Sequence, residues 1–263
     1  MDLGIAGKVA AVGGASKGMG RAIAMGLAQE GCRVAICARG REALDATAAD
    51  IRAEAGAEVL PVVCDMSRHE DIRRFIVQTV ETFGRLDIVV NNAGGPPLGT
   101  FEEHSEEAWQ AALDQNLLSV VRTVREALPH LRRAGGGRII NITSVAVKEP
   151  VDRLILSNTA RLGVVGLAKT LSKELGPDNI TVNNVCPGFT LTDRLRQVWE
   201  ARARSEGRPV DEVIQEEAQR IPLRRVGQPE DVAALVVFLA SEPARQITGI
   251  TVQVDGGSTA AVM

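Results

Sequence analysis

An apolar run leads directly into a glycine-rich turn near the start of the chain, in the segment KVAAVGGASKGMG at residues 8–20. The apolar part has the composition of a strand buried on both faces, and a helical pattern follows from Gly18. Glycines at positions 14, 18 and 20 permit positive φ angles and allow a phosphate to approach the backbone. The following helix start offers free N–H groups and the positive end of its dipole. The segment therefore predicts a dinucleotide-binding turn, although an adenosyl-cofactor methyltransferase remains an alternative on this motif alone.

Short apolar runs alternate with longer amphipathic stretches along the rest of the chain. Seven strands alternating with six helices indicate right-handed crossovers and an α/β fold, which is a single Rossmann-type domain over residues 1–263. Its sheet should be parallel and doubly wound, with helices on both faces. The expected strands are Lys8–Ala15, Arg33–Arg39, Val59–Asp65, Leu86–Asn91, Arg138–Thr143, Thr181–Cys186 and Ile250–Val254. The expected helices are Gly18–Glu30, Arg41–Ala55, His69–Phe83, Glu106–Ala134, Ser157–Leu175 and Pro229–Ala240.

The charged segment at residues 190–222 is the least regular part of the chain. It follows the sixth expected strand, at the edge where parallel sheets bind ligands, so we expect a variable substrate lid there. A solvated pair of surface helices explains the same composition equally well.

Composition and charge argue against several classes of protein. A formal net charge of −3 over 263 residues is unsuited to general binding of nucleic acid or of an anionic membrane. No apolar run reaches membrane-spanning length, and the first eight residues lack the pattern of a signal peptide. The four cysteines have no metal-ligand spacing. They fit reduced core thiols in a cytoplasmic protein better than disulfides or a metal site.

The end of the second expected strand bears on the choice between NAD(H) and NADP(H). An acidic side chain there would bind the ribose 2′-OH of NAD and repel a 2′-phosphate. Here Ala38 holds that position, Arg39 follows it, and Lys17 lies in the glycine turn. Two cations without a carboxylate favour NADP(H), because arginine can bind a phosphate through two hydrogen bonds. The alternative is that Arg39 and Arg41 merely begin a solvated helix.

Further motifs follow the glycine turn in a defined order, at Asp65, Asn91–Gly94, Asn116, Ser144, Pro187-Gly188 and Asp255–Gly257. Their register resembles that of the classical short-chain dehydrogenases/reductases, from about Leu3 to Ser258, and most nearly the 3-oxoacyl-(acyl carrier protein) reductases. The resemblance implies a homo-oligomer, either a tetramer or a dimer. It also implies a cofactor site made by Gly14, Ser16, Lys17, Gly18, Met19, Gly20, Arg39, Asp65, Met66, Asn92, Ala93, Gly94, Arg161, Pro187, Gly188 and Thr192.

The resemblance also implies individual roles. Asp65 would face the adenine ring, and Asn91–Gly94 would lie beside the cofactor ribose. Asn116 would kink its helix and hold a proton-relay water, while Ser144 would hydrogen-bond the substrate oxygen. Pro187, Gly188 and Thr192 would line the nicotinamide pocket. For each position taken alone, a strand cap or a turn is the plain structural alternative.

The chain departs from the family pattern at the acid–base pair. It contains no tyrosine, and the position of the family tyrosine, thirteen residues after Ser144, holds Ser157. Arg161 holds the position of the family lysine, four residues later and on the same helix face. A phenol beside a lysine exchanges protons near working pH, whereas a serine is a far weaker acid and an arginine keeps its proton. Arg161 is expected to bond the cofactor ribose and to polarise a carbonyl or hold a carboxylate.

Three functions follow from this altered site. The first is NADP(H)-dependent reduction of a carbonyl or imine group of a small molecule. In it Ser144 and Ser157 would bond the developing oxyanion, Arg161 would supply charge, and a water near Asn116 would deliver the proton. The second is a non-catalytic NADP(H)-binding sensor or structural partner, and the third is non-redox chemistry on a nucleotide scaffold. Lys148 and Arg153 hint at an anionic substrate, although exposed basic residues explain them as well.

Overall fold

All seven strands of the central sheet run parallel, in the order β3-β2-β1-β4-β5-β6-β7. The computed structural model describes residues 1–262. Because the chain winds outward from β1 to β3 and then returns to β4 beside β1, the winding reverses between β1 and β4, where doubly wound sheets bind ligands. This arrangement confirms the predicted fold. The strands are β1 (Val9–Val12), β2 (Arg33–Ala38), β3 (Val59–Val63), β4 (Ile88–Asn91), β5 (Gly137–Ile142), β6 (Ile180–Pro187) and β7 (Thr251–Val254).

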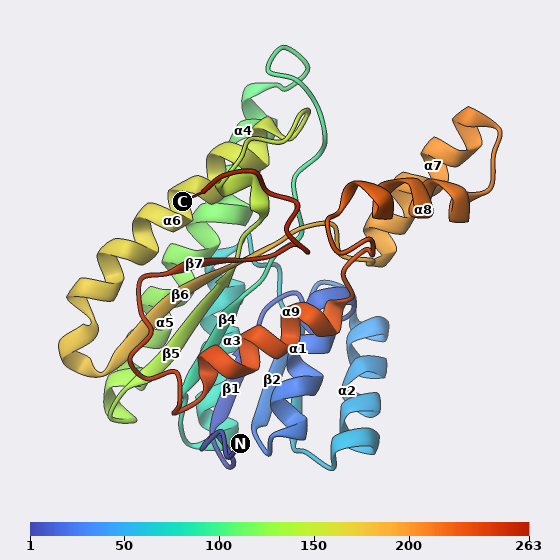
Figure 1. The fold of residues 1–263 in the computed structure, drawn as a ribbon. Coiled ribbons are helices and arrows are strands. Elements are labelled where there is room, and N and C mark those ends of the chain that lie inside the picture. Colours follow the sequence, from blue (N-terminus) through green and yellow to red (C-terminus); the bar gives the residue numbers. More distant parts are fainter. Residues whose placement is uncertain (263) are drawn as a thin grey trace.

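Helices cover both faces of the sheet (Figure 1). One face packs on α1 (Gly18–Gln29), α2 (Arg41–Ala55) and α9 (Pro229–Ala240). The other packs on α3 (His69–Phe83), α5 (Ser119–Arg133) and α6 (Ile155–Glu174). Alternate residues of β1 enter the two hydrophobic cores, with Ala10 and Val12 on one side and Val9 and Ala11 on the other. Burial on both faces explains why the strands read as continuous apolar runs.

The single helix expected over residues 106–134 is divided into three parts. It consists of α4 (Glu106–Leu113), a π-helical turn η1 (Asp114–Leu118) and α5. Within it the Asn116 amide donates to the Ala112 carbonyl at 3.3 Å, and the Ser119 hydroxyl donates to the Gln115 carbonyl at 2.6 Å. Such side-chain bonds compete with the regular helix ladder, and a π turn places a side chain off the helical repeat. The expected helical range is therefore interrupted at Asn116, the residue where the resemblance implied a kink.

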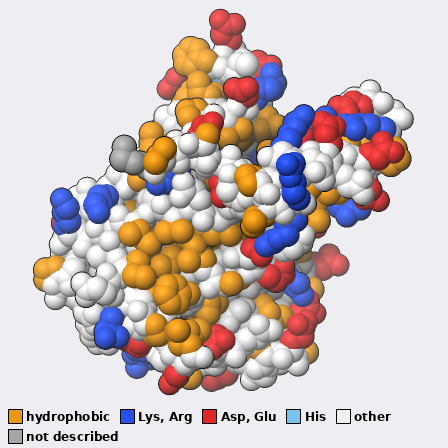
Figure 2. Space-filling model, in the orientation of Figure 1, with side chains coloured by type: hydrophobic (Ala, Val, Ile, Leu, Met, Phe, Trp, Pro, Cys, Tyr) orange, Lys and Arg blue, Asp and Glu red, His pale blue; other side chains and the backbone are white. Residues whose placement is uncertain are grey.

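Residues 190–222 form a helix pair that projects beyond the carboxyl ends of the strands (Figure 1). Its helices α7 (Asp193–Glu206) and α8 (Val210–Arg220) enclose a small core of their own around Trp199 and Val213. On their surface Arg202 bonds Glu206, Glu216 and Glu217, and Figure 2 shows basic and acidic side chains intermixed over this pair. The pair is thus a unit with its own internal contacts, and its opening as a lid stays a prediction.

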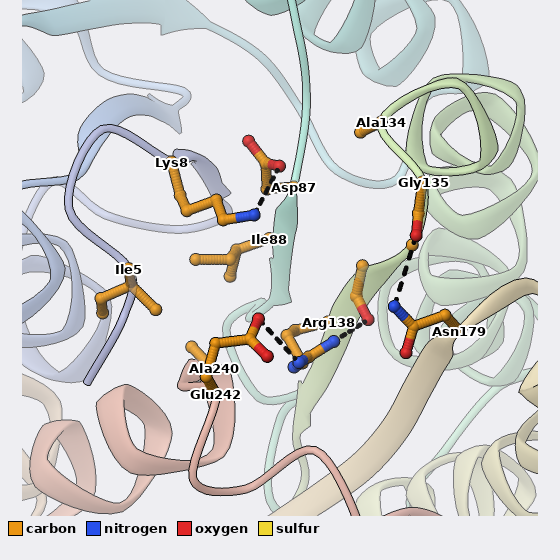
Figure 3. A pocket seen from close by; sticks show the side chains of 12 residues that line it. Ile5, Lys8, Asp87, Ile88, Ala134, Gly135, Arg138, Asn179, Ala240 and Glu242 are labelled. Carbon is orange, nitrogen blue, oxygen red and sulfur yellow. Dashed lines mark hydrogen bonds and ion pairs between the residues drawn. The ribbon is translucent and has the colours of Figure 1, made fainter. Parts of the chain in front are cut away.

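The amino ends of the strands are closed by ion pairs (Figure 3). Asp87 lies 3.7 Å from Lys8 and accepts from the Arg85 side chain, while buried Arg138 pairs with Glu242 at 3.2 Å. The cavity between these groups measures about 50 Å³, which has room for a few water molecules but not for a dinucleotide. We therefore look for the functional site at the opposite end of the sheet.

The shorter helical segments are the 3₁₀ turns η2 (Val145–Val147) and η3 (Gly176–Asp178). All four cysteines are buried and unpaired. Over residues 1–262, no helix is both long enough and apolar enough to cross a membrane.

Candidate functional site

A cleft of about 360 Å³ lies at the carboxyl ends of the strands. It is bounded by the loops after β1, β2, β3 and β4, together with the start of α7 and one face of α6. The structure brings together here most of the predicted cofactor residues, namely Gly14, Ser16, Lys17, Gly18, Met19, Gly20, Arg39, Asp65, Met66, Asn92, Ala93, Gly94, Arg161 and Thr192. These residues come from segments far apart in the sequence, so the shared cleft is a result of folding.

The turn between β1 and α1 leaves no space for a side chain at Gly14 or at Gly20. Gly14 has a φ of 57°, and a Cβ atom there would lie 2.8 Å from the Asn92 carbonyl oxygen. A Cβ atom on Gly20 would lie 2.3 Å from the Gly14 carbonyl oxygen. The Asn92 amide holds the turn by donating to the Gly13 and Gly14 carbonyls at 3.1 and 3.2 Å. Because no side chain caps α1, its first N–H groups are available to a ligand, so this turn fits a dinucleotide phosphate.

The far end of the cleft is formed by the loops after β2 and β3. Ala38 and Arg39 line it from one loop, and Asp65 and Met66 line it from the other. One Asp65 carboxylate oxygen accepts from the Ser67 backbone at 2.9 Å and from its hydroxyl at 2.8 Å. A carboxylate at the end of β2 would select against a 2′-phosphate. Here Ala38 holds that position, and the cation Arg39 follows it.

The substituted pair Ser157 and Arg161 lies one turn apart on α6, where Arg161 lines the cleft and Ser157 lies behind the lining. Both side chains are buried, and Arg161 Nε donates to Ser157 Oγ at 3.2 Å. Nη1 donates to the carbonyls of Ile142 and Thr143 at 2.9 and 3.1 Å, and Nη2 donates to the carbonyl of Ala93 at 3.3 Å. Arg161 therefore joins the ends of β4 and β5 to α6.

This network limits what Arg161 can do for a ligand. Of the five N–H groups of a guanidinium, these four bonds leave one hydrogen, on Nη2, for the cleft. The sequence predicted contacts to ribose or substrate but gave no sign of the three backbone carbonyls. Burial, followed by repulsion from Arg194, lowers the pKa of Arg161 to about 10. The side chain is thus still a cation at neutral pH.

Two serine hydroxyls lie near this network. Ser144 begins η2, which packs on α6, and its Oγ accepts from the Ala146 backbone at 3.2 Å. Ser157 Oγ accepts from Arg161. Within the described chain neither hydroxyl donates its own hydrogen, so each retains a donor for an oxygen atom of a ligand.

Asn116 is buried in the π turn and is short of one hydrogen bond. Its amide nitrogen bonds Ala112, but its Oδ1 has no donor within residues 1–262. A buried carbonyl oxygen without a donor costs free energy, and an ordered water can satisfy it. The side chain is therefore suited to hold a water, as the resemblance implied.

The start of α7 reaches across the cleft. A Cβ atom built on Gly18 would lie 3.2 Å from the Thr192 methyl group, and Asp193 pairs with Lys17 at 3.9 Å. Arg194 donates to the carbonyls of Gly95 and of Pro96, the latter at 2.8 Å. The sequence alone did not point to Arg194, because a basic residue in a charged helix carries no signal of its own.

Some predicted residues lie outside the cleft lining, among them the predicted catalytic residues Asn116, Ser144 and Ser157. Pro187 and Gly188 end β6 against the segment after β7, where a Cβ atom on Gly188 would lie 2.7 Å from Asp255 Cβ. Packing alone therefore requires that glycine. Arg153 is exposed, pairs with Glu103 at 3.2 Å and lies away from the cleft lining, so it gives little support for an anionic substrate.

Comparison with known proteins gives the family. A family model described as enoyl-(acyl carrier protein) reductase matches residues 14–259. Dehydrogenase/reductase SDR family member 4 from Oryctolagus cuniculus is 36% identical, over 97% of this chain and 94% of the relative. This chain belongs to the short-chain dehydrogenase/reductase family. Membership rules out the methyltransferase alternative.

Two further short-chain dehydrogenases/reductases show how completely the chain matches. A 3-oxoacyl-(acyl-carrier-protein) reductase from Staphylococcus epidermidis is 35% identical, over 95% of this chain and 98% of the relative. The crystal structure of L-sorbose reductase from Gluconobacter frateurii, complexed with NADPH and L-sorbose, superposes with a TM-score of 0.97. Its sequence is 33% identical, and the match covers 100% of each chain. The family consists of oxidoreductases that use nicotinamide cofactors, and this chain has its complete fold.

Proposed function

We propose that the protein is an NADP(H)-dependent reductase of a carbonyl or imine group in a small molecule. The carrying observation is the buried Ser157–Arg161 pair, joined at 3.2 Å beside a cleft whose glycine turn fits a dinucleotide. This pair replaces the tyrosine and lysine of the family. The site thus keeps a hydrogen-bond donor and a positive charge at the reaction centre but has no side chain that releases a proton near neutral pH.

The preference for NADP(H) rests on the charges at the far end of the cleft. Arg39 lies there, Lys17 lines the cleft from the glycine turn, and Ala38 stands where an acid would select NAD(H). Lys17 pairs with Asp193 at 3.9 Å, but both side chains are about two-thirds exposed. An exposed pair of this kind contributes little, so Lys17 is available to a phosphate. The L-sorbose reductase to which this chain is similar is complexed with NADPH, which supports the same assignment.

The reaction needs hydride, oxyanion stabilisation and a proton. The nicotinamide ring, when bound, supplies the hydride, and the electron pair of the reacting double bond moves onto its oxygen or nitrogen. Ser144 and Ser157 donate hydrogen bonds to that atom, and Arg161 polarises Ser157 by donating to its Oγ. A water on Asn116 Oδ1 delivers the proton and is reprotonated from solvent. Loss of a matched general acid costs about 10²–10⁴ in rate, so imines already protonated in solution suit this site best.

A turnover experiment tests the proposal. The purified protein is mixed with NADPH or NADH and a panel of ketones, diketones and cyclic imines, and the absorbance of the reduced cofactor is followed. We expect turnover with kcat/KM at least about tenfold higher for NADPH, because charged hydrogen bonds to a phosphate are worth over ~1.4 kcal/mol. Lys17→Gln combined with Arg39→Gln should remove that preference and leave NADH turnover unchanged.

A second candidate function is a non-catalytic NADP(H)-binding protein, favoured by the absence of the tyrosine. Tight NADPH binding without turnover of any compound in the panel would support it and reject the reductase. Absence of binding to either dinucleotide would reject both.

We also propose that the protein is a cytoplasmic homo-oligomer, a dimer or a tetramer. Within residues 1–262 the edge strand β7 pairs with β6 alone, and Figure 2 shows a hydrophobic area over α9 and β7. Leu235 of α9 and Ile250, which precedes β7, are partly buried. The four buried, unpaired cysteines fit a reducing compartment. Light scattering after gel filtration tests the assembly, and a monomer at micromolar concentration would contradict it.

A further inference from the structure

Three arginines, Arg39, Arg161 and Arg194, line the cleft, and within residues 1–262 no carboxylate balances any of them. Arg39 lies at the far end, whereas Arg161 and Arg194 lie elsewhere in the lining. Arg161 is buried and Arg194 is exposed, and both contribute to the wall of the cleft. Across residues 1–262 neither has an Asp or Glu oxygen within 4.0 Å, in contrast to the neighbouring Arg196 and Arg202 of α7. The partners of Arg161 and Arg194 are backbone carbonyls, which satisfy hydrogen bonds without neutralising charge.

A buried cation without a counter-charge is an unfavourable arrangement that an anion relieves. Transfer of a charged group from water into a protein interior is costly unless the charge is paired. The lowered pKa of Arg161 reflects that cost, and the second cause of the shift is repulsion from Arg194. An anion placed at this part of the cleft would interact favourably with both guanidinium groups.

Unused donors at this point match the oxygens of a carboxylate. Arg161 keeps one hydrogen on Nη2. Arg194 uses one hydrogen bond from each Nη and keeps Nε together with one hydrogen on each of those nitrogens. Ser157 retains its hydroxyl hydrogen and is shorter than the tyrosine it replaces, so a ligand can approach the helix more closely.

We propose that this part of the cleft binds a carboxylate of the substrate, which is a small 2-oxo or 2-imino acid. Arg161 Nε donates to Ser157 Oγ at 3.2 Å, so the serine hydroxyl and the guanidinium that carries the unused Nη2 hydrogen are direct neighbours. Such neighbouring donors suit two polar groups on adjacent carbons of one ligand. In a 2-oxo acid the carbonyl and the carboxylate are adjacent in this way. Ser144 and Ser157 then bond the reacting oxygen, while Arg161 and Arg194 hold the carboxylate. This inference rests on the proposed reductase function and names its substrate class.

The cofactor phosphates are the other anions that could occupy the cleft, and they have their own partners. The glycine turn and the uncapped start of α1 fit the pyrophosphate, and Arg39 lies at the far end. Arg161 lies instead on α6, next to both serines. The substrate would differ in charge from L-sorbose, the neutral sugar bound by the structural neighbour.

The first test measures binding without turnover. Oxamate, a carboxylate that resembles a 2-oxo acid but is not reduced, is titrated into the protein saturated with NADPH, with oxamide as the neutral analogue. We expect oxamate to bind at least about tenfold more tightly than oxamide, as for a charge-assisted hydrogen bond. Competition between oxamate and NADPH would place the anion in the cofactor phosphate site and overturn the inference.

Variants locate the site. Arg194→Gln should weaken oxamate by about tenfold. Arg161→Lys keeps a charge but lacks the planar fork, and it should weaken oxamate similarly while its fold is checked by thermal unfolding. Arg153→Gln is the matched control, because Arg153 is exposed and paired with Glu103 outside the cleft lining. If Arg153→Gln weakens oxamate as much as Arg194→Gln does, the inference is wrong.

Reduction of a 2-oxo acid and of its ester distinguishes the carboxylate site from the reductase activity. We expect 2-oxobutanoate to be reduced with a kcat/KM at least about tenfold above that of its methyl ester. Reduction of the ester with equal or higher efficiency overturns the carboxylate inference and leaves the reductase intact. Specific oxamate binding with no reduction of any acid, ester or imine leaves the carboxylate site intact and rejects the reductase.

Discussion

At the scale of single residues, Arg161 does more than replace a lysine. A lysine ammonium has three donors on one atom, whereas the guanidinium spreads its donors over Ser157 and the carbonyls of Ile142, Thr143 and Ala93. The side chain is therefore part of the structure that joins two strand ends to α6. Restoring the family pair Tyr and Lys would remove these contacts as well as change the chemistry.

Arg161→Lys should destabilise the protein by about 1–3 kcal/mol, because buried carbonyl oxygens lose donors. Urea unfolding with and without NADPH measures the change. Lys169→Arg on the exposed face of the same helix is the control and should change stability by less than about 0.5 kcal/mol. An equal effect of both variants would mean that the carbonyl contacts contribute nothing.

Oxamate affinity should be constant between about pH 6 and pH 9 and should fall as the pH approaches the Arg161 pKa of about 10. The positive charge that Arg161 contributes to anion binding is present below that pKa and is lost above it. Isothermal titration across this range checks the profile. A loss of affinity near neutral pH would assign the anion to another group.

At the scale of elements, α7 and α8 form a unit that contacts the body mainly through its ends. Their core is separate from the two cores of the sheet. Contacts across the cleft are the Arg194 bonds to the Gly95–Pro96 loop and the Lys17–Asp193 pair. A unit with its own core and few outside contacts can move without unfolding.

Arg194→Ala should speed NADPH dissociation by about five- to tenfold and change global stability by less than about 1 kcal/mol, because it removes a contact across the cleft but none in a core. Stopped-flow fluorescence measures the release. Arg204→Ala, on the same helix but outside the cleft, is the control. Equal release rates in the parent and the Arg194 variant would show that the Arg194 contact does not slow NADPH dissociation.

Acid should loosen the α7–α8 unit before the rest. Hydrogen bonds from Arg208 and Arg202 lower the pKa of Glu216 from 4.5 to about 2. A lowered carboxyl pKa contributes stability above its unfolded value, and that contribution is lost as the pH falls from 4.5 towards 2. Cleavage by an acid protease within residues 190–222 should therefore rise over this range, and Glu216→Gln should show the same cleavage already at pH 4.5. A cleavage pattern that does not change with pH would show that the ionised Glu216 does not stabilise the α7–α8 unit.

At the scale of the whole molecule, the two ends of the sheet have separate tasks. The carboxyl end holds the cleft, and the amino end is fixed by buried Asp87, which accepts from the Val9 backbone at 2.9 Å and from Arg85 Nε at 2.8 Å. The strands between the two ends are packed by a hydrophobic core on each face of the sheet, which holds both ends in place. Within the described residues, no side chain of the Asp87 network lines the cleft.

Asp87→Asn should destabilise the protein by about 2–4 kcal/mol and leave NADPH affinity unchanged, because it breaks a buried charged network far from the cleft. Chemical unfolding and a fluorescence titration measure the two quantities. Asp178→Asn removes a more exposed pair with Arg132 and should cost less than about 1 kcal/mol. A large loss of affinity in the Asp87 variant would show that the two ends are coupled.

Local patterns were sufficient for most of the fold and for the place of the site. Buried parallel strands give continuous apolar runs, and the glycine turn needs small residues whatever surrounds it, so β1, α1 and the cleft beside them were predictable. The family resemblance implied a kink at Asn116, but its π-helical form was not predictable, because helix periodicity continues through a single π turn. For residues 190–222 the composition fitted a lid or a pair of surface helices equally well, and it did not predict the small core that α7 and α8 share.

The absence of tyrosine, the Ser157–Arg161 substitution and the alternating strands and helices are properties of the amino-acid order, readable without coordinates. The environment of the substituted pair is a property of the folded chain. Ala93 is 68 residues from Arg161, and Arg194 meets Gly95 across 99 residues. Such contacts arise only when the sheet stacks the ends of β4 and β5 beneath α6 and brings α7 over them. Side-chain chemistry is therefore local to the sequence, whereas charge balance and burial depend on neighbours that folding supplies.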